Sequence, residues 1–293
     1  MHDINYTHKH ELDEHDFSAC CKDCQSSVDI IKPHVMAFAK RIRGYTQEML
    51  AELSPGDLYR LYQILDDLAH MKAGVHLAGL VLKEPDIRRE LGAIRSYYAA
   101  FFDIHEGHLA KELLKSDAPW ETLKSFPLFA RYKLLVRNQI EAMPVTPDTR
   151  LVFIGCGPVP ITLILMNRLY GIRSLGMDES SGAVETANNV IRRLGMEKEI
   201  RIIHGDDSDL KNPDWNMALI SALAEPKSRI FQTLRQLLKE REHASVVFRT
   251  YTGMRTILYE PVKPADIVGF RIVKEILPTG RVNNTTVFAE LDE

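Results

Sequence analysis

The chain is 293 residues long, and its 45% hydrophobic and 26% charged residues are typical of an ordinary globular protein. A formal net charge of −3 supplies no bulk attraction to DNA, RNA or anionic lipid, so neither nucleic acid nor membrane is an expected partner. No apolar run reaches the roughly 20 residues of a membrane span, and the acidic N-terminus does not resemble a signal peptide. We therefore expect a cytoplasmic protein of about two domains.

Residues 1–25 have little apolar content and are predicted to form a mobile tail that contains cysteine and histidine. Cys20, Cys21 and Cys24 are three of only four cysteines, too few for a secreted disulfide framework. Together with nearby histidines they have loose metal-ligand spacing. Two alternatives stay open: an adventitious flexible cluster, or a regulatory or loading site for nickel, copper or zinc.

Residues 26–143 read as a helical domain. The segment SPGDLYRLYQILDDL (54–68) begins with a Ser cap and a Pro in the first turn, then spaces apolar residues three and four apart. Residues 84–114 carry a second apolar stripe, and residues 128–143 continue the helical pattern without a strand-like interruption. The Pro- and Thr-rich segment PVTPDTR (144–150) is the expected domain boundary.

Residues 144–293 alternate short apolar runs with helical segments, which predicts an α/β domain with a parallel sheet covered on both faces. Two closing strand-like runs favour a Rossmann-like sheet of the class I methyltransferase type, parallel with an antiparallel last strand. The expected strands are 151–155, 173–177, 199–205, 216–222, 244–250, 270–276 and 285–291, and the expected helices lie near 159–169, 181–194 and 226–239.

The segment LVFIGCGPVPITLIL (151–165) opens like a nucleotide-binding turn. In such sheets the ligand lies beyond the carboxyl ends of the strands, where Gly155 and Gly157 would let backbone approach it closely. Pro158 and Pro160 remove N–H donors that a pyrophosphate would use. S-adenosylmethionine has no phosphate, so the turn suits it better than NAD, although a structural turn is the simpler alternative.

Three acidic residues follow the next two strands. Asp178 comes about 20 residues after the glycines, where a carboxylate can accept both ribose hydroxyls of a cofactor. Asp206 and Asp207 follow the third strand, where an acid commonly faces the adenine amino group. For all three, capping of the following helix is the alternative explanation.

Five segments together resemble nicotianamine synthase, in particular its short archaeal form. The resemblance runs from about residue 85 to 290 and says nothing about the tail. The segments are SDAPWETLKSF (116–126), IGCGPVPITLIL (154–165), SALAEPKSRIF (221–231), FRTYTGMRTILYEPV (248–262) and LPTGRVNNTTV (277–287).

This resemblance implies transfer of a 3-amino-3-carboxypropyl group from S-adenosylmethionine to an amine, with release of methylthioadenosine and formation of a metal-chelating product. Glutamate with repeated additions is the archaeal-type expectation, and closure of an azetidine ring is the plant-type alternative. Glu106 would be the general base, with Tyr132 orienting it, and no metal is expected in catalysis. The alternatives are a solvated helix charge and a packing tyrosine. Both residues belong to the helical domain, which would then form a lid over the sheet.

Further residues are assigned by position. Ala222 and Leu223, in the fourth strand's loop, are expected to contact the cofactor. A stiff turn at Pro158 and Pro160 could direct the amino-acid tail of the cofactor toward the incoming amine, because displacement requires an in-line nucleophile. The substrate carboxylates would be held by guanidinium forks and a nearby hydroxyl, with ordinary surface side chains as the alternative. The candidates are Arg131, Arg249, Arg255 and Tyr251.

Several other residues have a structural explanation that competes with a functional one. Asn283 and Asn284 suit either a type I′ turn or ligand contact. His105, His108 and Glu112 could chelate a metal by their helical spacing, but no further ligand is evident. Cys156 is expected to pack as a small apolar residue. The rival functions are an ordinary methyltransferase and a metal chaperone or sensor that uses the tail; a homodimer is a further expectation.

Overall fold

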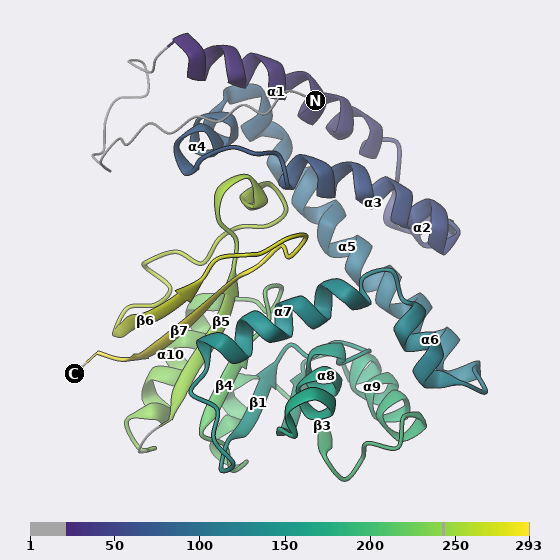
Figure 1. The fold of residues 1–293 in the computed structure, drawn as a ribbon, viewed down its shortest axis with the longest axis vertical. Coiled ribbons are helices and arrows are strands. Elements are labelled where there is room, and N and C mark those ends of the chain that lie inside the picture. The colour runs from purple at the N-terminus through teal and green to yellow at the C-terminus, as the bar shows by residue number, and fades with distance from the viewer. Residues whose placement is uncertain (1–21, 242–243, 293) are drawn as a thin grey trace. The chain divides into compact units, whose positions relative to one another are not determined.

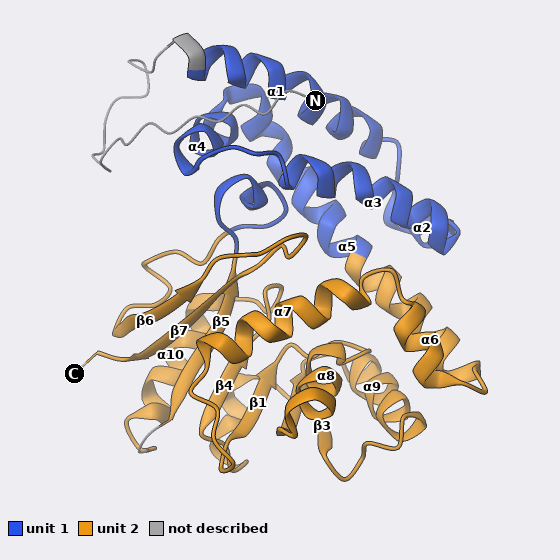
Figure 2. Ribbon diagram, in the orientation of Figure 1, with its two compact units in different colours: residues 1–101, 251–260 blue, residues 102–250, 261–293 orange. Residues whose placement is uncertain are grey.

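The computed structural model describes residues 22–241 and 244–292, in two compact units (Figure 2). Unit 1 is the chain up to residue 101 together with residues 251–260, and unit 2 contains residues 102–250 and 261–293. The sequence predicted a domain boundary between residues 143 and 144, which divides the chain at a different place. That boundary stays a prediction. Cys20, Cys21 and the N-terminal histidines lie outside the described residues. Helix α1 begins at Lys22, so residues 22–25 are helical although the sequence assigned them to the tail.

Unit 1 is a bundle of helices. It contains α1 (Lys22–Ile42), α2 (Gln47–Glu52), α3 (Pro55–Ala69), α4 (Val75–Lys83), the first half of α5 (Pro85–Lys115) and the short helix η3 (Gly253–Ile257). The Ser54 hydroxyl caps α3 by accepting the Asp57 N–H at 3.1 Å, as the sequence predicts. In the core of this unit the ring of Tyr62 stacks on Phe101 with centroids 4.0 Å apart.

Unit 2 is built on a seven-stranded sheet with the order β3-β2-β1-β4-β5-β7-β6 (Figure 1). The first five strands pair in parallel, and β7 is antiparallel to both β5 and β6. The strands are β1 (Arg150–Ile154), β2 (Arg173–Asp178), β3 (Ile200–His204), β4 (Met217–Ile220), β5 (Ser245–Thr250), β6 (Phe270–Ile276) and β7 (Thr285–Leu291).

Helices cover both faces of this sheet. On one face lie α7, α8 and α9, and α10 lies on the other (Figure 1). The helices of unit 2 are the rest of α5, α6 (Pro119–Ser125), α7 (Phe129–Ala142), α8 (Ile161–Tyr170), α9 (Ser181–Arg193) and α10 (Lys227–Leu238), with the short helix η2 (Asp207–Lys211) after β3. The Rossmann-like class predicted from the sequence is confirmed, and each predicted strand coincides with an observed one.

Strand alternation decides which side chains meet which helix. Val152 and Phe248 face the core beneath α10, so their neighbours Phe153 and Arg249 face α7 and α8. The turns after β1 and β4 adjoin where the strand order reverses, the usual ligand position in such sheets. No helix of the described ranges is long and apolar enough to cross a membrane.

Phe231 on α10 is 1% exposed and makes edge contacts with Phe248 at 5.1 Å and Phe270 at 5.5 Å. Phe231→Ala should lower the free energy of unfolding by about 3–5 kcal/mol, because the core beneath α10 cannot collapse into the space left by the ring. Urea denaturation followed by circular dichroism measures this. Leu169→Ala, at a side chain 47% exposed, is the control and should change it by less than about 0.5 kcal/mol. A similar small loss in both variants would contradict the assigned core.

Candidate active site

The turn between β1 and α8 is fixed against β2. Gly155 and Gly157 have φ values of +75° and +69°, a region that residues with a Cβ atom rarely adopt. The N–H groups of Gly155 and Cys156 both donate to the carbonyl of Met177, at 2.9 and 3.1 Å. The two glycines therefore have the backbone conformation that a close ligand approach requires.

Asp178, at the end of β2, holds the same turn. Its Oδ2 accepts the Gly157 N–H at 2.9 Å, and its Oδ1 accepts the Ser180 N–H at 3.0 Å. Ser180, rather than Asp178, caps α9 by accepting the Ala183 N–H. Since each carboxylate oxygen can accept a second hydrogen bond, Asp178 retains acceptor capacity for the hydroxyls of a ribose.

Glu106 and Tyr132 meet beside this turn. Glu106 lies on the part of α5 that belongs to unit 2, and the Tyr132 hydroxyl on α7 donates to its Oε1 at 2.8 Å. A Cβ atom added to Gly157 would lie 3.0 Å from Oε2 of Glu106. Two residues assigned by resemblance thus adjoin a turn assigned from its glycines, all within one compact unit. The lid that the sequence led us to expect stays a prediction.

Burial raises the pKa of Glu106 to about 7, because a desolvated carboxylate disfavours its charged form. The Tyr132 hydrogen bond and the positive charge of Arg249 oppose this rise, and the negative charges of Asp103 and Asp178 add to it. The carboxyl group is therefore about half deprotonated at neutral pH. That protonation state suits a group that must accept a proton and then release it.

Arg249, near the end of β5, is 6% exposed and positioned by neutral groups from two helices. Its Nη2 donates to the Thr162 hydroxyl at 2.6 Å and to Gln139 Oε1 at 3.4 Å, and its guanidinium carbon lies 5.1 Å from the centre of the Phe153 ring. Sequence reasoning missed Thr162 and Gln139. No sequence signal could have found them, since they lie 87 and 110 positions from Arg249.

The other carboxylate-binding candidates are divided between the units. Arg131 is half-buried on α7 of unit 2, one residue before Tyr132. Tyr251 and Arg255 belong to unit 1, where the Tyr251 hydroxyl donates to that of Tyr98 at 3.3 Å. Only Arg131 and Arg249 thus share a compact unit with Glu106.

Asp206 and Asp207 are engaged in local structure. Asp206 caps η2 by accepting the Ser208 N–H at 2.8 Å, and the buried Asp207 accepts from Arg229 Nε at 2.8 Å. With Glu179 they form the group of acidic residues, among those described, that is close enough to share a cation. Arg229 already forms ion pairs with Asp207 and Glu179, so a guanidinium group offsets part of the negative charge of this cluster.

The turn before β7 and the surroundings of His105 bear on two expectations, and the absence of a metal at the histidines stays a prediction. The turn before β7 is at Gly280, with φ of +54°, whereas Asn283 and Asn284 are buried outside it, so the type I′ explanation is wrong. Burial and the charge of His108 lower the pKa of His105 to about 4. The His105 ring lies 4.8 Å from that of Phe126, which is the structural role that the sequence favoured.

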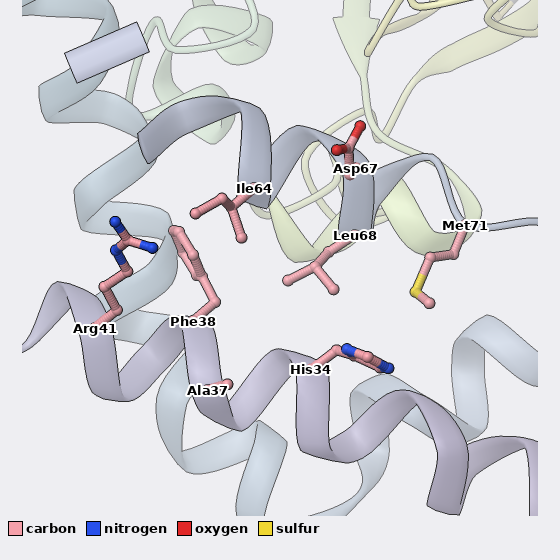
Figure 3. Close-up of a pocket in the computed structure, with 8 residues that line it drawn as sticks. All are labelled: His34, Ala37, Phe38, Arg41, Ile64, Asp67, Leu68 and Met71. Carbon is pink, nitrogen blue, oxygen red and sulfur yellow. The ribbon is translucent and has the colours of Figure 1, made fainter. Parts of the chain in front are cut away.

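A separate hollow lies between α1 and α3 in unit 1 (Figure 3). Its volume is about 380 Å³, and its lining contains none of the predicted site residues. His34, Arg41 and Asp67, all exposed, are its only strongly polar lining residues. The catalytic residues predicted from the sequence therefore do not line this hollow.

A family model described as nicotianamine synthase protein matches residues 24–293. The chain belongs to the nicotianamine synthase family. The resemblance predicted from five sequence segments is thereby confirmed, and the match extends the family region to Cys24, beyond the segments that first indicated it.

Two solved structures are similar over nearly the whole chain. MtNAS in complex with MTA and tNA is 32% identical with a TM-score of 0.82, covering 90% of this chain and 98% of that one. A mutant of MtNAS in which glutamine replaces a glutamate, in complex with S-adenosylmethionine, is 30% identical with a TM-score of 0.82, covering 93% and 99%. This chain thus shares its fold with MtNAS over at least 90% of its length.

Curated relatives match over shorter regions. L-histidine 2-aminobutanoyltransferase of Pseudomonas aeruginosa strain PAO1 is 26% identical over 48% of this chain and 53% of its own length. Nicotianamine synthase 3 of Oryza sativa subsp. indica is 30% identical over 63% of this chain and 58% of its own length. The chain therefore spans less than two thirds of these curated relatives.

Tyr132→Phe should raise the pKa of Glu106 above its value of about 7, because the hydrogen bond that is lost stabilises the carboxylate. Nuclear magnetic resonance titration of protein labelled with ¹³C-glutamate measures the change without requiring catalysis. Tyr170→Phe, at a side chain 43% exposed, is the matched control and should leave the titration unchanged. An unchanged or lowered pKa in Tyr132→Phe would show that the hydroxyl does not donate to this carboxylate.

Proposed function

We propose that the chain transfers 3-amino-3-carboxypropyl groups from S-adenosylmethionine to the amine of an amino acid, building a nicotianamine-type metal chelator. The observation that carries this proposal is the position of Glu106, whose pKa is about 7, against the glycine turn. Family membership and the S-adenosylmethionine-bound MtNAS mutant support the same substrate. The two glycines and the remaining acceptor capacity of Asp178 fit a ligand with a ribose and no phosphate.

The proposed step is a displacement in which each bond is accounted for. The unprotonated amine attacks the γ-carbon of the amino-acid tail as the carbon–sulfur bond breaks. The electron pair of that bond stays on sulfur, so neutral methylthioadenosine leaves. Glu106 accepts the proton that the amine loses, and the Tyr132 hydroxyl holds the carboxylate in place. The reaction therefore requires no oxidant or reductant.

Position decides which of the three carbons on the sulfonium reacts, because the nucleophile must be in line with the breaking bond. Pro160 is buried and immediately precedes α8, and Pro158 is half-buried in the same turn. These residues stiffen the segment against which the tail of the substrate would lie. We infer that the turn presents the γ-carbon, rather than the methyl group, to an amine beside Glu106.

The acceptor is proposed to be an amino acid such as glutamate, with its carboxylates held by guanidinium groups. Arg249 is the candidate favoured by the structure, because Thr162 and Gln139 position its guanidinium and its charge acts on Glu106. Arg131 is the second candidate in unit 2, and the contributions of Tyr251 and Arg255 from unit 1 are part of the same proposal. Homodimer formation and cytoplasmic location remain expectations.

The deciding experiment identifies the spent cofactor. The full chain is incubated with labelled S-adenosylmethionine and candidate amino acids, including glutamate and histidine, and the products are analysed by mass spectrometry. Methylthioadenosine together with an acceptor heavier by one aminocarboxypropyl group is the expected result. S-adenosylhomocysteine with a methylated acceptor would overturn the proposal in favour of an ordinary methyltransferase.

Glu106→Gln should lower kcat by about 10²–10⁴-fold while S-adenosylmethionine still binds, because an amide cannot accept the proton but has a similar shape. Single-turnover kinetics and calorimetric titration measure the two quantities separately. In the parent protein, kcat should rise with pH through a pKa near 7. Glu112→Gln, about 1.7 turns further along α5 at an exposed position, is the control and should retain activity. Full activity in Glu106→Gln would remove the general base from the mechanism.

A further inference from the structure

Lys227, the first residue of α10, is buried although nothing in the proposed chemistry uses it. It is 6% exposed, and burial lowers the pKa of its ammonium group. A positive charge at the N-terminus of a helix is also disfavoured by the helix dipole. Burial and the helix dipole both disfavour the charged form of Lys227, so local interactions must offset these two free-energy costs.

The hydrogen bonds and the ion pair of the ammonium group are with the loop that follows β4, and the negative charge of Asp266 adds a further favourable interaction. The Lys227 ammonium donates to the carbonyl of Ala222 at 3.1 Å and to the carbonyl of Ala224. It also forms an ion pair with Glu225 Oε1 at 3.4 Å, and Glu225 Oε2 accepts the Lys227 N–H at 3.0 Å. The side chain therefore folds back over residues 222–225 and closes this loop onto the start of α10.

The 222–225 loop, held in this way, packs against the glycine turn. A Cβ atom added to Gly155 would lie 2.9 Å from Cβ of Ala224 and 3.2 Å from Cβ of Ser221. The loop and the turn follow β4 and β1, which are neighbours in the sheet at the point where the strand order reverses. A displacement of Ala224 would therefore change the packing against Gly155.

The contact with Ala222 also fixes the direction of the next peptide N–H. In a trans peptide the C=O and the following N–H point in opposite directions, so the Leu223 N–H points away from the ammonium. Within the described part of the chain, no backbone or side-chain group accepts a hydrogen bond from it. The Leu223 N–H is thus a donor held in a set direction and left for a ligand.

We propose that Lys227 is a positioning residue for S-adenosylmethionine, holding the 222–225 loop so that the Leu223 N–H donates to the bound cofactor. This inference rests on the proposed function. Lys227 itself does not touch the cofactor, because its three donors are directed at the loop. Its charge acts on the two carbonyls, and its effect reaches the cofactor through the backbone.

The test is a comparison of Lys227→Met, Lys227→Arg and Lys239→Met in the full chain. Lys227→Met keeps the apolar stem but leaves two buried carbonyls unpaired, so the KM and the calorimetric Kd for S-adenosylmethionine should rise on the order of tenfold or more. The kcat at saturating cofactor should change by less than about threefold, since the chemical step does not involve Lys227. Lys227→Arg restores donors to both carbonyls and should recover most of the affinity.

One control variant, and the split between KM and kcat, separate positioning from a general loss of structure. Lys239→Met removes an exposed lysine at the C-terminal end of the same helix and should leave the KM within about twofold. Partial unfolding of Lys227→Met would lower the active fraction and hence the apparent kcat, without raising the KM of the folded molecules. An unchanged KM and Kd in Lys227→Met, or a fall in kcat alone, would overturn the inference. Failure of the parent protein to release methylthioadenosine would instead count against the proposed function.

Discussion

The contact between the Glu106 carboxylate and Gly157 is the constraint on which the arrangement of the site depends. A Cβ atom at position 157 would lie 3.0 Å from Oε2 of Glu106, and its backbone φ of +69° is one that other residues rarely adopt. Glycine therefore satisfies two requirements at once, the sharp turn after β1 and the close approach of α5. Any larger residue would have to move the carboxylate or strain the turn.

Gly157 is also placed between two carboxylates. Its N–H donates to Asp178, while Glu106 lies against its Cα, and the negative charge of Asp178 raises the pKa of Glu106. Two acidic groups beside one turn create a negative local field that favours cationic ligands. S-adenosylmethionine carries a sulfonium and an ammonium group, and a protonated acceptor carries another ammonium. Burial is the main cause of the raised pKa of Glu106, and the negative charge of Asp178, which adds to it, would also attract the cationic groups of the proposed substrates.

Local patterns predicted the fold of unit 2 because each strand lies within a short apolar run bounded by turn residues. The glycine turn and Asp178 could also be proposed from the sequence, because their spacing places them at the ends of two successive strands of one strand–turn–helix unit. Glu106 could be predicted only through family resemblance, because it approaches Gly157 from a segment 51 positions away in the sequence. Nothing in the sequence indicated a role for Lys227, because a lysine at the start of a helix normally faces solvent.

In some places the structure has a local interaction that the sequence did not reveal. Adjacent asparagines suggested a turn at residues 283 and 284, but Gly280 adopts the positive φ and both asparagines are buried. Asp207 was assigned to an adenine contact, and Arg229 and Thr233 donate to its carboxylate, so the adenine contact stays a prediction. Both cases depend on which neighbour reaches the position in three dimensions.

The pKa of Glu106 distinguishes the proposed chemistry from methyl transfer to a nucleophile that is already unprotonated. The α-amino group of a free amino acid is mostly an ammonium ion near neutrality, and the ammonium form cannot attack. A base with a pKa of about 7 accepts a proton from an amine at a lower free-energy cost than a solvated glutamate with a pKa of about 4.3 would, and it can release the proton to water afterwards. A fully solvated glutamate would be too weak a base for the same task. In the proposed mechanism, the burial of Glu106 is what adapts an ordinary carboxylate to an amine acceptor.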